Sequence, residues 1–255
     1  MTPDLEAELA DRTHPELRAL QVASAERGDQ ARAAAIAGIL RAREDAWRDP
    51  EPLDIYDDSL VHRGVKERGL VHLEGDWHRS FHCWLFCPER RAVYLQRRAA
   101  SKRTYPGFLD TSVAGHLRAG ESVREACREG EEELGVPLDF SSLVPLGRSV
   151  DMARHGILID REVAEVFACP VALPPQAFRP DRAEVASVLE CGLQEFQALF
   201  CAGQASVPAQ EYADGADGIP VQIRAGEFTR HHDAYYARLA LQLGRLVAGQ
   251  APLRI

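Results

Sequence analysis

The sequence lacks the features that mark several large classes of protein. None of its apolar runs approaches the ~20 residues of a membrane-spanning helix, and its acidic start has no apolar signal stretch. Basic residues are scarce as well, since 30 Lys and Arg stand against 39 Asp and Glu and give a net charge of −9 at pH 7. Because a general nucleic-acid surface is usually basic, we expect no bulk nucleic-acid binding, no membrane location and no secretion.

Paired cysteines are also missing. The chain has six cysteines but no C-x-x-C pair, so neither a disulfide framework nor a zinc site is indicated. We therefore expect free thiols in a cytoplasmic protein. What remains is ordinary for a globular chain of 255 residues, with 45% hydrophobic and 27% charged residues. This length suits one large domain, or one medium domain with appendages.

Turn-forming residues and hydrophobic periodicity divide the chain into three zones. In the first, Pro15 suits the first turn of a helix that Thr13 would cap, and Gly28 marks a break before a second helix. The resulting helical hairpin either packs on the main domain or provides a homodimer contact. The predicted zones are a helical N-terminal extension at 1–50, a main domain at 51–203, and a loop with a C-terminal helix packed on that domain at 204–255.

Short apolar segments bounded by turn residues predict strands in the main domain. The clearest pair lies at 80–87 and 92–96, joined by a turn at 88–91. We further expect strands at 147–150 and 162–169, a loop at 170–180, a partly helical segment at 184–200, a loop at 202–221 and a terminal helix at 228–247. His231 and its two neighbours would diverge on that helix, which argues against a metal cluster there.

A helix rich in acids follows the second strand pair. Ser122 and Glu125 form a capping-box pattern, and Gly135 suits a left-handed C-cap, so the spacing predicts a helix over 123–134.

Three carboxylates share one face of this helix. Glu129, Glu132 and Glu133 are spaced i, i+3 and i+4, which places them close together. Like charges at this spacing are destabilising unless a cation lies among them, and Mg²⁺ prefers oxygen ligands of this kind. The alternative is a solvated acidic helix face.

The segment 115–136 resembles the Nudix box, G-x5-E-x7-R-E-U-x-E-E-x-G-U, in which U is a bulky aliphatic residue. The chain departs from the pattern twice: six residues instead of seven separate Glu121 from Arg128, and Gly130 stands at a bulky aliphatic position. In a helix interior, glycine costs about 1 kcal/mol relative to alanine. The positions that agree are Gly115, Glu121, Arg128, Glu129, Glu132, Glu133, Gly135 and Val136.

The resemblance implies an α/β fold, a Nudix-type α/β/α sandwich with a mixed β-sheet, to which the N-terminal helical extension and the C-terminal helix are added. It also implies that Glu129, Glu132 and Glu133 bind Mg²⁺ or Mn²⁺ and that the protein hydrolyses a diphosphate linkage. Arg128 would orient an acid through a charge-assisted bond. Either Glu132 or Glu133 would accept the proton of the attacking water.

The similarity extends to the Nudix branch that includes isopentenyl diphosphate isomerase and its hydrolase-like relatives. In the isomerases a proton-transferring cysteine precedes the Gly-His pair, whereas this chain has Ala114, which has no titratable proton. Glu129 stands where the isomerases keep a basic residue. Both differences point to a hydrolase. The similar segments are 76–86, 95–104, 105–107 and 112–116.

Other features of the isomerases persist. His78, His116 and Glu162 match positions that bind metal there, and Asp160 matches a nearby acid. Each histidine could instead be a structural hydrogen-bonding residue. His78, Glu121 and Glu162 are thus candidates for a second metal or for the general base, and Glu165 and Glu184 are alternative bases.

Basic residues are expected to bind the substrate. Arg98 and Lys102 match residues that hold the diphosphate in the isomerases, and we place His116 beside them as a substrate-binding residue. A basic patch near an acidic helix is what an anionic diphosphate needs. These cations could also be solvated surface charges.

Three functions fit this pattern. The first is a divalent-metal-dependent pyrophosphohydrolase acting on a nucleoside diphosphate derivative or a similar small molecule. The second is a non-catalytic nucleotide-binding or regulatory module, which the shortened loop and Gly130 motivate. The third is an isomerase-like enzyme acting on a prenyl diphosphate, which Ala114 disfavours. The sequence does not identify the diphosphate substrate.

Overall fold

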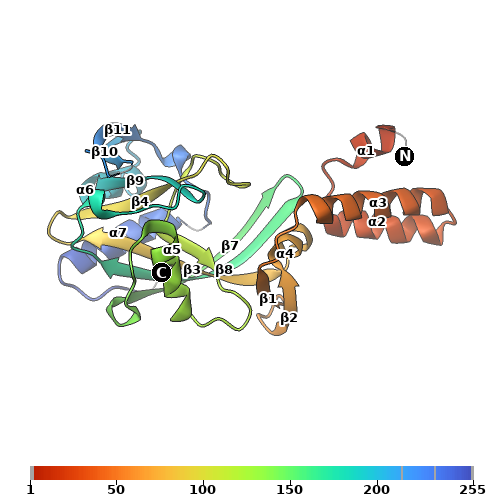
Figure 1. Cartoon of the computed structure of the whole chain (residues 1–255), viewed down its shortest axis with the longest axis horizontal. Coiled ribbons are helices and arrows are strands. Elements are labelled where there is room, and N and C mark those ends of the chain that lie inside the picture. The colour runs from red at the N-terminus through yellow and green to blue at the C-terminus, as the bar shows by residue number, and fades with distance from the viewer. Residues whose placement is uncertain (1–2, 214, 233, 254–255) are drawn as a thin grey trace. The chain divides into compact units, whose positions relative to one another are not determined.

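The structure is a computed structural model that describes residues 3–213, 215–232 and 234–253. Its contacts divide the chain into two compact units (Figure 1). Among the described residues, no helix has both the length and the apolar character of a membrane span. Unit 1 comprises Met1–Arg79, Leu117–Gly120 and Asp151–Val163, and unit 2 comprises Ser80–His116, Glu121–Val150 and Ala164–Ile255.

The N-terminal extension is helical, as predicted, and lies in unit 1. Thr13 caps one helix in a capping box, donating from its backbone N–H to Glu16 Oε2 over 2.6 Å. Asp29 caps the next by accepting from Arg32 N. Apolar side chains of both helices form a buried cluster, so the two pack side by side as a hairpin (Figure 1). The helices are α1 (Pro3–Leu9), α2 (His14–Glu26), α3 (Gln30–Ala46) and α4 (Arg68–Glu74).

Unit 1 also holds a small antiparallel hairpin, β1 (Pro52–Tyr56) with β2 (His62–Glu67). Tyr56 extends the pairing to Trp77, the first residue of β3. The helix α4 ends at Gly75, whose φ of 75° is left-handed and therefore favours glycine. Its turn returns the chain into β3.

Unit 2 is built on a sheet with the strand order β11-β10-β9-β4-β3, with β5 and β6 added beside β4 and β3. The predicted turn at 88–91 joins β3 to β4, where Phe86 pairs with Val93. The strands β3, β7 and β8 carry the chain between the units. The strands are β3 (Trp77–Cys87), β4 (Ala92–Arg98), β5 (Leu109–Asp110), β6 (Val113–His116), β7 (Val144–His155), β8 (Leu158–Pro170), β9 (Val185–Gly192), β10 (Val207–Tyr212) and β11 (Ile219–Ile223).

Helices cover both faces of this sheet. The side chains of β3 alternate between the two faces and are buried on each. Trp84 packs against Phe196 and Tyr236 in the main core. Cys83 faces the other way, toward Cys127, which directly precedes the acid-rich helix. The helices of unit 2 are α5 (Arg128–Leu134), α6 (Leu193–Phe200) and α7 (Tyr235–Val247), with short 3₁₀ turns at Glu125–Cys127, Phe140–Ser142, Pro175–Ala177 and Ala225–Glu227.

Several predicted boundaries were wrong. The segment 202–221 is not only a loop, because it contains β10 and the start of β11. The prolines of this segment obscured its strand pattern. Pro220 lies in β11, the last strand of the sheet order, and the outer edge of such a strand needs no N–H donor. The segment 184–200 is partly helical, as predicted, with a strand before the helix. The terminal helix begins at Tyr235 rather than 228, so His231 precedes it.

Candidate active site

The acid-rich segment folds as predicted, although its first turn is 3₁₀ and the α-helix begins only at Arg128. Ser122 donates from its backbone N–H to Glu125 Oε2 over 2.8 Å, which completes the capping box. Gly135 ends α5 with a φ of 66°, the left-handed cap expected there.

Two of the three carboxylates point from α5 onto β6. Glu133 is buried, and one of its oxygens, Oε2, accepts a hydrogen bond of 3.0 Å from Ala114 N. Glu129 lies against Gly115 so closely that a Cβ at that glycine would overlap its carboxyl group. Gly115 thus provides the space for Glu129, and the two carboxylates lie one turn apart on the same face of the helix.

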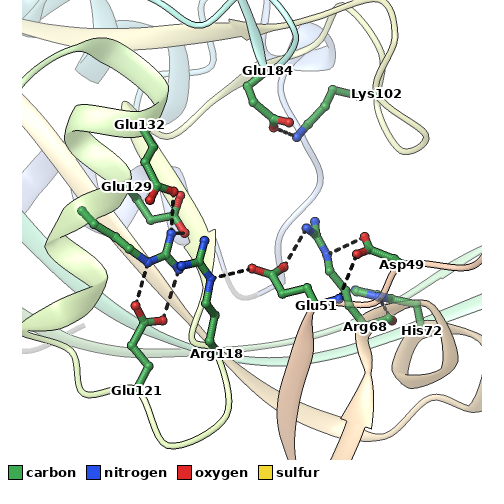
Figure 2. A network of polar contacts seen from close by, with 11 residues as sticks. Asp49, Glu51, Arg68, His72, Lys102, Arg118, Glu121, Glu129, Glu132 and Glu184 are labelled. Carbon is green, nitrogen blue, oxygen red and sulfur yellow. Dashed lines mark hydrogen bonds and ion pairs between the residues drawn. The ribbon is translucent and has the colours of Figure 1, made fainter.

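Glu132 joins the cluster through an arginine. Figure 2 shows Glu121, Glu129 and Glu132 turned toward one guanidinium, which is that of Arg128. Arg128 Nε lies 2.7 Å from Glu121 Oε1, and its Nη1 lies 2.7 Å from Glu129 Oε1 and 2.6 Å from Glu132 Oε2. The shortened loop therefore still brings Glu121 into the site, where it pairs with Arg128.

Burial changes the acidity of this cluster. Desolvation, together with the neighbouring Glu129 charge, raises the pKa of Glu133 to about 8. The Ala114 N–H and the Lys102 charge lower the same pKa. A divalent cation would act in the lowering direction, because it stabilises the carboxylate form.

Packing explains why Gly130 replaces a bulky aliphatic residue. A Cβ there would lie 2.6 Å from Val136 O and would also meet Leu138 Cγ. The chain after α5 therefore approaches the helix too closely for any side chain. The glycine does not mark a missing core contact, since Leu138 occupies that space.

The basic residues expected to hold a diphosphate each face a carboxylate. Arg98 Nη1 lies 2.9 Å from Asp110 Oδ2. Lys102 forms an ion pair with Glu184, and Figure 2 shows the two side chains facing each other. Since the Lys102 charge acts on Glu133, Lys102 lies in the electrostatic range of the acidic cluster.

The other predicted residues of unit 2 are placed as follows. His116 is half-buried on β6, opposite Ser80 in the pairing with β3. Glu165, an alternative base, accepts a hydrogen bond of 2.9 Å from Arg148 Nε. Their functional roles stay predictions.

A second cluster of metal-ligating side chains lies within unit 1. Ligand atoms of His78, Asp160 and Glu162 are within 4.8 Å of one another. His78 Nδ1 lies 3.1 Å from Asp76 O, and because a carbonyl only accepts, His78 donates from Nδ1 and turns Nε2 toward the cluster. That Nε2 lies 3.6 Å from Asp160 Oδ1.

Sequence reasoning missed His72. Its ring lies 4.9 Å from that of His78, and its Nδ1 likewise faces a carbonyl, Arg68 O, at 2.8 Å. Burial and the His78 charge lower the pKa of His72 to about 3, so its imidazole is neutral. Imidazole nitrogens beside a carboxylate form a donor set for a divalent cation. The signal that the sequence offered for His72 was its short distance along the chain from His78, since His72 lies in α4 and His78 near the start of β3.

Both clusters fit a divalent cation on their own chemistry. The first offers the carboxylate oxygens of Glu129 and Glu133, and the absence of a Cβ at Gly115 leaves room for the Glu129 carboxyl group. The second offers imidazole Nε2 atoms and carboxylate oxygens brought together by β3 and β8. Oxygen donors suit Mg²⁺ and Mn²⁺.

The family model of the NUDIX domain matches residues 76–208, just over half of the chain. The chain belongs to the Nudix family. This match includes β3, β4, β6 and the whole acidic cluster on α5. It confirms the resemblance read from the Nudix box and the Nudix-type α/β fold with flanking helices.

The relatives of this Nudix chain include proteins named as Nudix hydrolases and proteins named as isopentenyl-diphosphate isomerases. It is 29% identical over 192 residues to an uncharacterised Nudix hydrolase of Clostridium acetobutylicum, covering 73% of this chain and 93% of that protein. It is 36% identical over 172 residues to the isopentenyl-diphosphate Delta-isomerase of Mycolicibacterium vanbaalenii, covering 67% and 90%. The crystal structure of DR0079 from Deinococcus radiodurans is 22% identical with a TM-score of 0.45, covering 60% and 91%.

Proposed function

We propose that this Nudix protein is a divalent-metal-dependent pyrophosphohydrolase that cleaves a diphosphate linkage in a nucleoside diphosphate derivative or a similar small molecule. The observation that carries the proposal is the burial of Glu133 beside Glu129 against the backbone of β6. Burying two neighbouring carboxylates is costly unless positive charge compensates them. Arg128 compensates part of this charge, and a divalent cation would compensate the rest.

The acidic cluster divides the work among its residues. Glu129 and Glu133, with Glu132 beside them, would hold Mg²⁺ or Mn²⁺. When bound, such an ion supplies Lewis-acid stabilisation of the charge on the diphosphate. Arg128 orients Glu121 and Glu129 through its ion pairs, so the carboxylates keep their geometry when substrate arrives.

Proton transfer is assigned to Glu133. Without metal, burial raises its pKa to about 8. A bound cation would lower this pKa toward the working pH, where a base is most effective. The Ala114 N–H fixes Oε2 and thereby orients the carboxyl group. Glu132, whose side chain is 50% exposed, is the weaker candidate because its position is less constrained.

The diphosphate would be bound by Arg98, Lys102 and His116. An anionic substrate would displace the Glu184 carboxylate from Lys102, exchanging one charge pair for another. Arg98 keeps its Asp110 partner and can donate its remaining N–H groups to phosphate oxygens.

An isomerase activity is the second candidate, because a relative with that name is 36% identical to this chain. Ala114 disfavours it, since a methyl side chain cannot transfer the proton that isomerisation requires. A cytoplasmic location and a homodimer remain predictions of the sequence.

The experiment is a panel of diphosphate compounds assayed for phosphate or pyrophosphate release with Mg²⁺ and with Mn²⁺. We expect metal-dependent turnover that falls about 100-fold or more in Glu133→Gln. Glu131→Gln is the control, because Glu131 is exposed on the same helix outside the cluster. Turnover unchanged in Glu133→Gln would refute the assigned role. Binding without turnover would favour the regulatory module, and isomerised prenyl diphosphate would favour the isomerase.

A further inference from the structure

A chain of buried hydrogen bonds in unit 2 connects Arg98 to a segment outside the family match. Residues 228–236 follow the matched region, which ends at 208. Phe228 forms a parallel bridge with Leu109, and Thr229 N donates to Leu109 O over 2.9 Å. Phe228 and Thr229 are thereby fixed beside β5, the strand that carries Asp110.

The side chains continue this connection. Thr229 Oγ1 donates to Asp110 Oδ1 over 3.0 Å, while Asp110 Oδ2 pairs with Arg98 Nη1. The hydroxyl of Tyr236, the second residue of α7, lies 2.7 Å from Thr229 Oγ1 and 3.0 Å from Thr229 O. Asp110 therefore has one oxygen for Arg98 and another for Thr229.

Burial makes this arrangement restrictive. Asp110, Thr229 and Tyr236 are only 6%, 5% and 8% exposed, and hydrogen bonds in such surroundings are stronger and better oriented than in water. Arg98 also donates from Nε and Nη2 to Thr104 O. Three of its five N–H groups are thus used among the described residues, which leaves two for phosphate oxygens.

The neighbouring arginine provides a matched comparison. Arg97 pairs with Glu211, which accepts a hydrogen bond of 2.5 Å from Ser187 Oγ. This second set also joins a hydroxyl, a carboxylate and an arginine. It connects β4, β9 and β10 within the sheet, and none of its members is a proposed substrate contact.

We propose that Thr229, supported by Tyr236, is a positioning residue that holds Arg98 in the orientation required to bind the substrate diphosphate, acting through Asp110. The inference rests on the proposed function, because it takes Arg98 as a diphosphate contact. The C-terminal segment thus becomes part of the substrate-binding apparatus without touching the substrate.

The test uses Thr229→Val, which keeps the shape but removes the hydroxyl, with Thr229→Ser as the conservative variant. Two readouts are measured on the full chain: KM and kcat on the substrate found in the panel, and the Kd of inorganic pyrophosphate with Mg²⁺. Thr229→Val should raise KM and Kd about 5- to 20-fold, with kcat changed less than twofold. Thr229→Ser should restore both. Ser187→Ala, the matched control, should leave both near wild type.

Each other result overturns the inference. It is wrong if Arg98→Gln weakens pyrophosphate binding but Thr229→Val does not, or if Ser187→Ala has the same effect as Thr229→Val. The proposed function fails separately, when the wild type hydrolyses no compound, and the pyrophosphate Kd then still decides the role of Thr229. A wild type that does not bind pyrophosphate would refute the role of Arg98 and the inference with it. Thermal unfolding of each variant identifies any loss of folding.

Discussion

The two clusters of candidate metal ligands balance their charges by different means. In unit 2, three glutamates surround Arg128, so a cationic side chain already compensates part of their charge. In unit 1, His72 and His78 face Asp160 as imidazoles, and the lowered pKa of His72 keeps that ring neutral. The acidic cluster therefore carries a cationic side chain of its own, whereas the histidine cluster relies on a ring that burial keeps neutral.

The difference follows from the secondary structure that carries each cluster. A single helix turn places glutamates close together, and their mutual repulsion requires a nearby cation. The histidine cluster collects its members from α4, β3 and β8, so no single helix turn brings like charges together there. Four predictions test this contrast, from the largest expected effect to the smallest.

Adding a methyl group at Gly115 should disable the acidic cluster alone. In Gly115→Ala the new Cβ occupies the place of the Glu129 carboxyl group, so that side chain must move. We expect a loss of turnover of about 100-fold, with a small change in Tm because a flexible side chain can yield. Gly226→Ala is the control, since its Cβ would meet open space. Full activity of Gly115→Ala would show that Glu129 has no role.

Removing a histidine should affect metal binding in unit 1. His78→Ala deletes a ligand that faces Asp160, and we expect Mn²⁺ affinity at one site to fall about 10- to 100-fold. Isothermal titration with Mn²⁺ measures the number of sites and each affinity. The exposed His62, paired with Asp54 on β1 and β2, provides the control His62→Ala. Equal Mn²⁺ binding by both variants and the wild type would rule out a metal site there.

Removing the internal cation should make the acidic cluster resemble the histidine cluster. Arg128→Gln leaves the glutamates without their counter-charge, so the metal-free protein should lose about 2–4 kcal/mol of unfolding free energy. Added Mg²⁺ should recover much of this loss. Arg148→Gln, in which an exposed side chain loses its contact to Glu165, should change Tm little. Thermal unfolding in EDTA and in Mg²⁺ would contradict the prediction if Arg128→Gln melted like the wild type.

The smallest effect is a pH dependence of the metal-free protein. Because the folded-state pKa of Glu133 is raised to about 8 from its usual 4.5, the unfolded chain releases this proton first. The stability that Glu133 contributes is therefore present below pH ~4.5 and lost as the pH rises through ~8. Glu133→Gln should lack this loss, so its Tm should exceed that of the wild type increasingly between pH 5 and 8. The prediction is wrong if the Tm difference between Glu133→Gln and the wild type stays constant across this pH range.

Local patterns in the sequence predicted much of the structure. The capping box at Ser122, the left-handed Gly135 and the glutamate spacing depend on contacts within a few residues, and all were found as expected. The hairpin of β3 and β4 was equally local. The β10–β11 hairpin was missed because prolines in a sequence suggest a loop. Only the strand order shows that Pro220 lies in a terminal strand, where proline is tolerated.

The sequence by itself determined the Nudix helix, its acids and the strands that flank it, because these features have a short period and local hydrogen bonds. Only the tertiary structure decided the rest. It showed that Gly130 makes room for Leu138, that Glu121 reaches Arg128 across the shortened loop, and that Thr229 supports Asp110 from more than a hundred residues away. Each of these depends on how separate segments pack, and packing distances leave no period in a sequence.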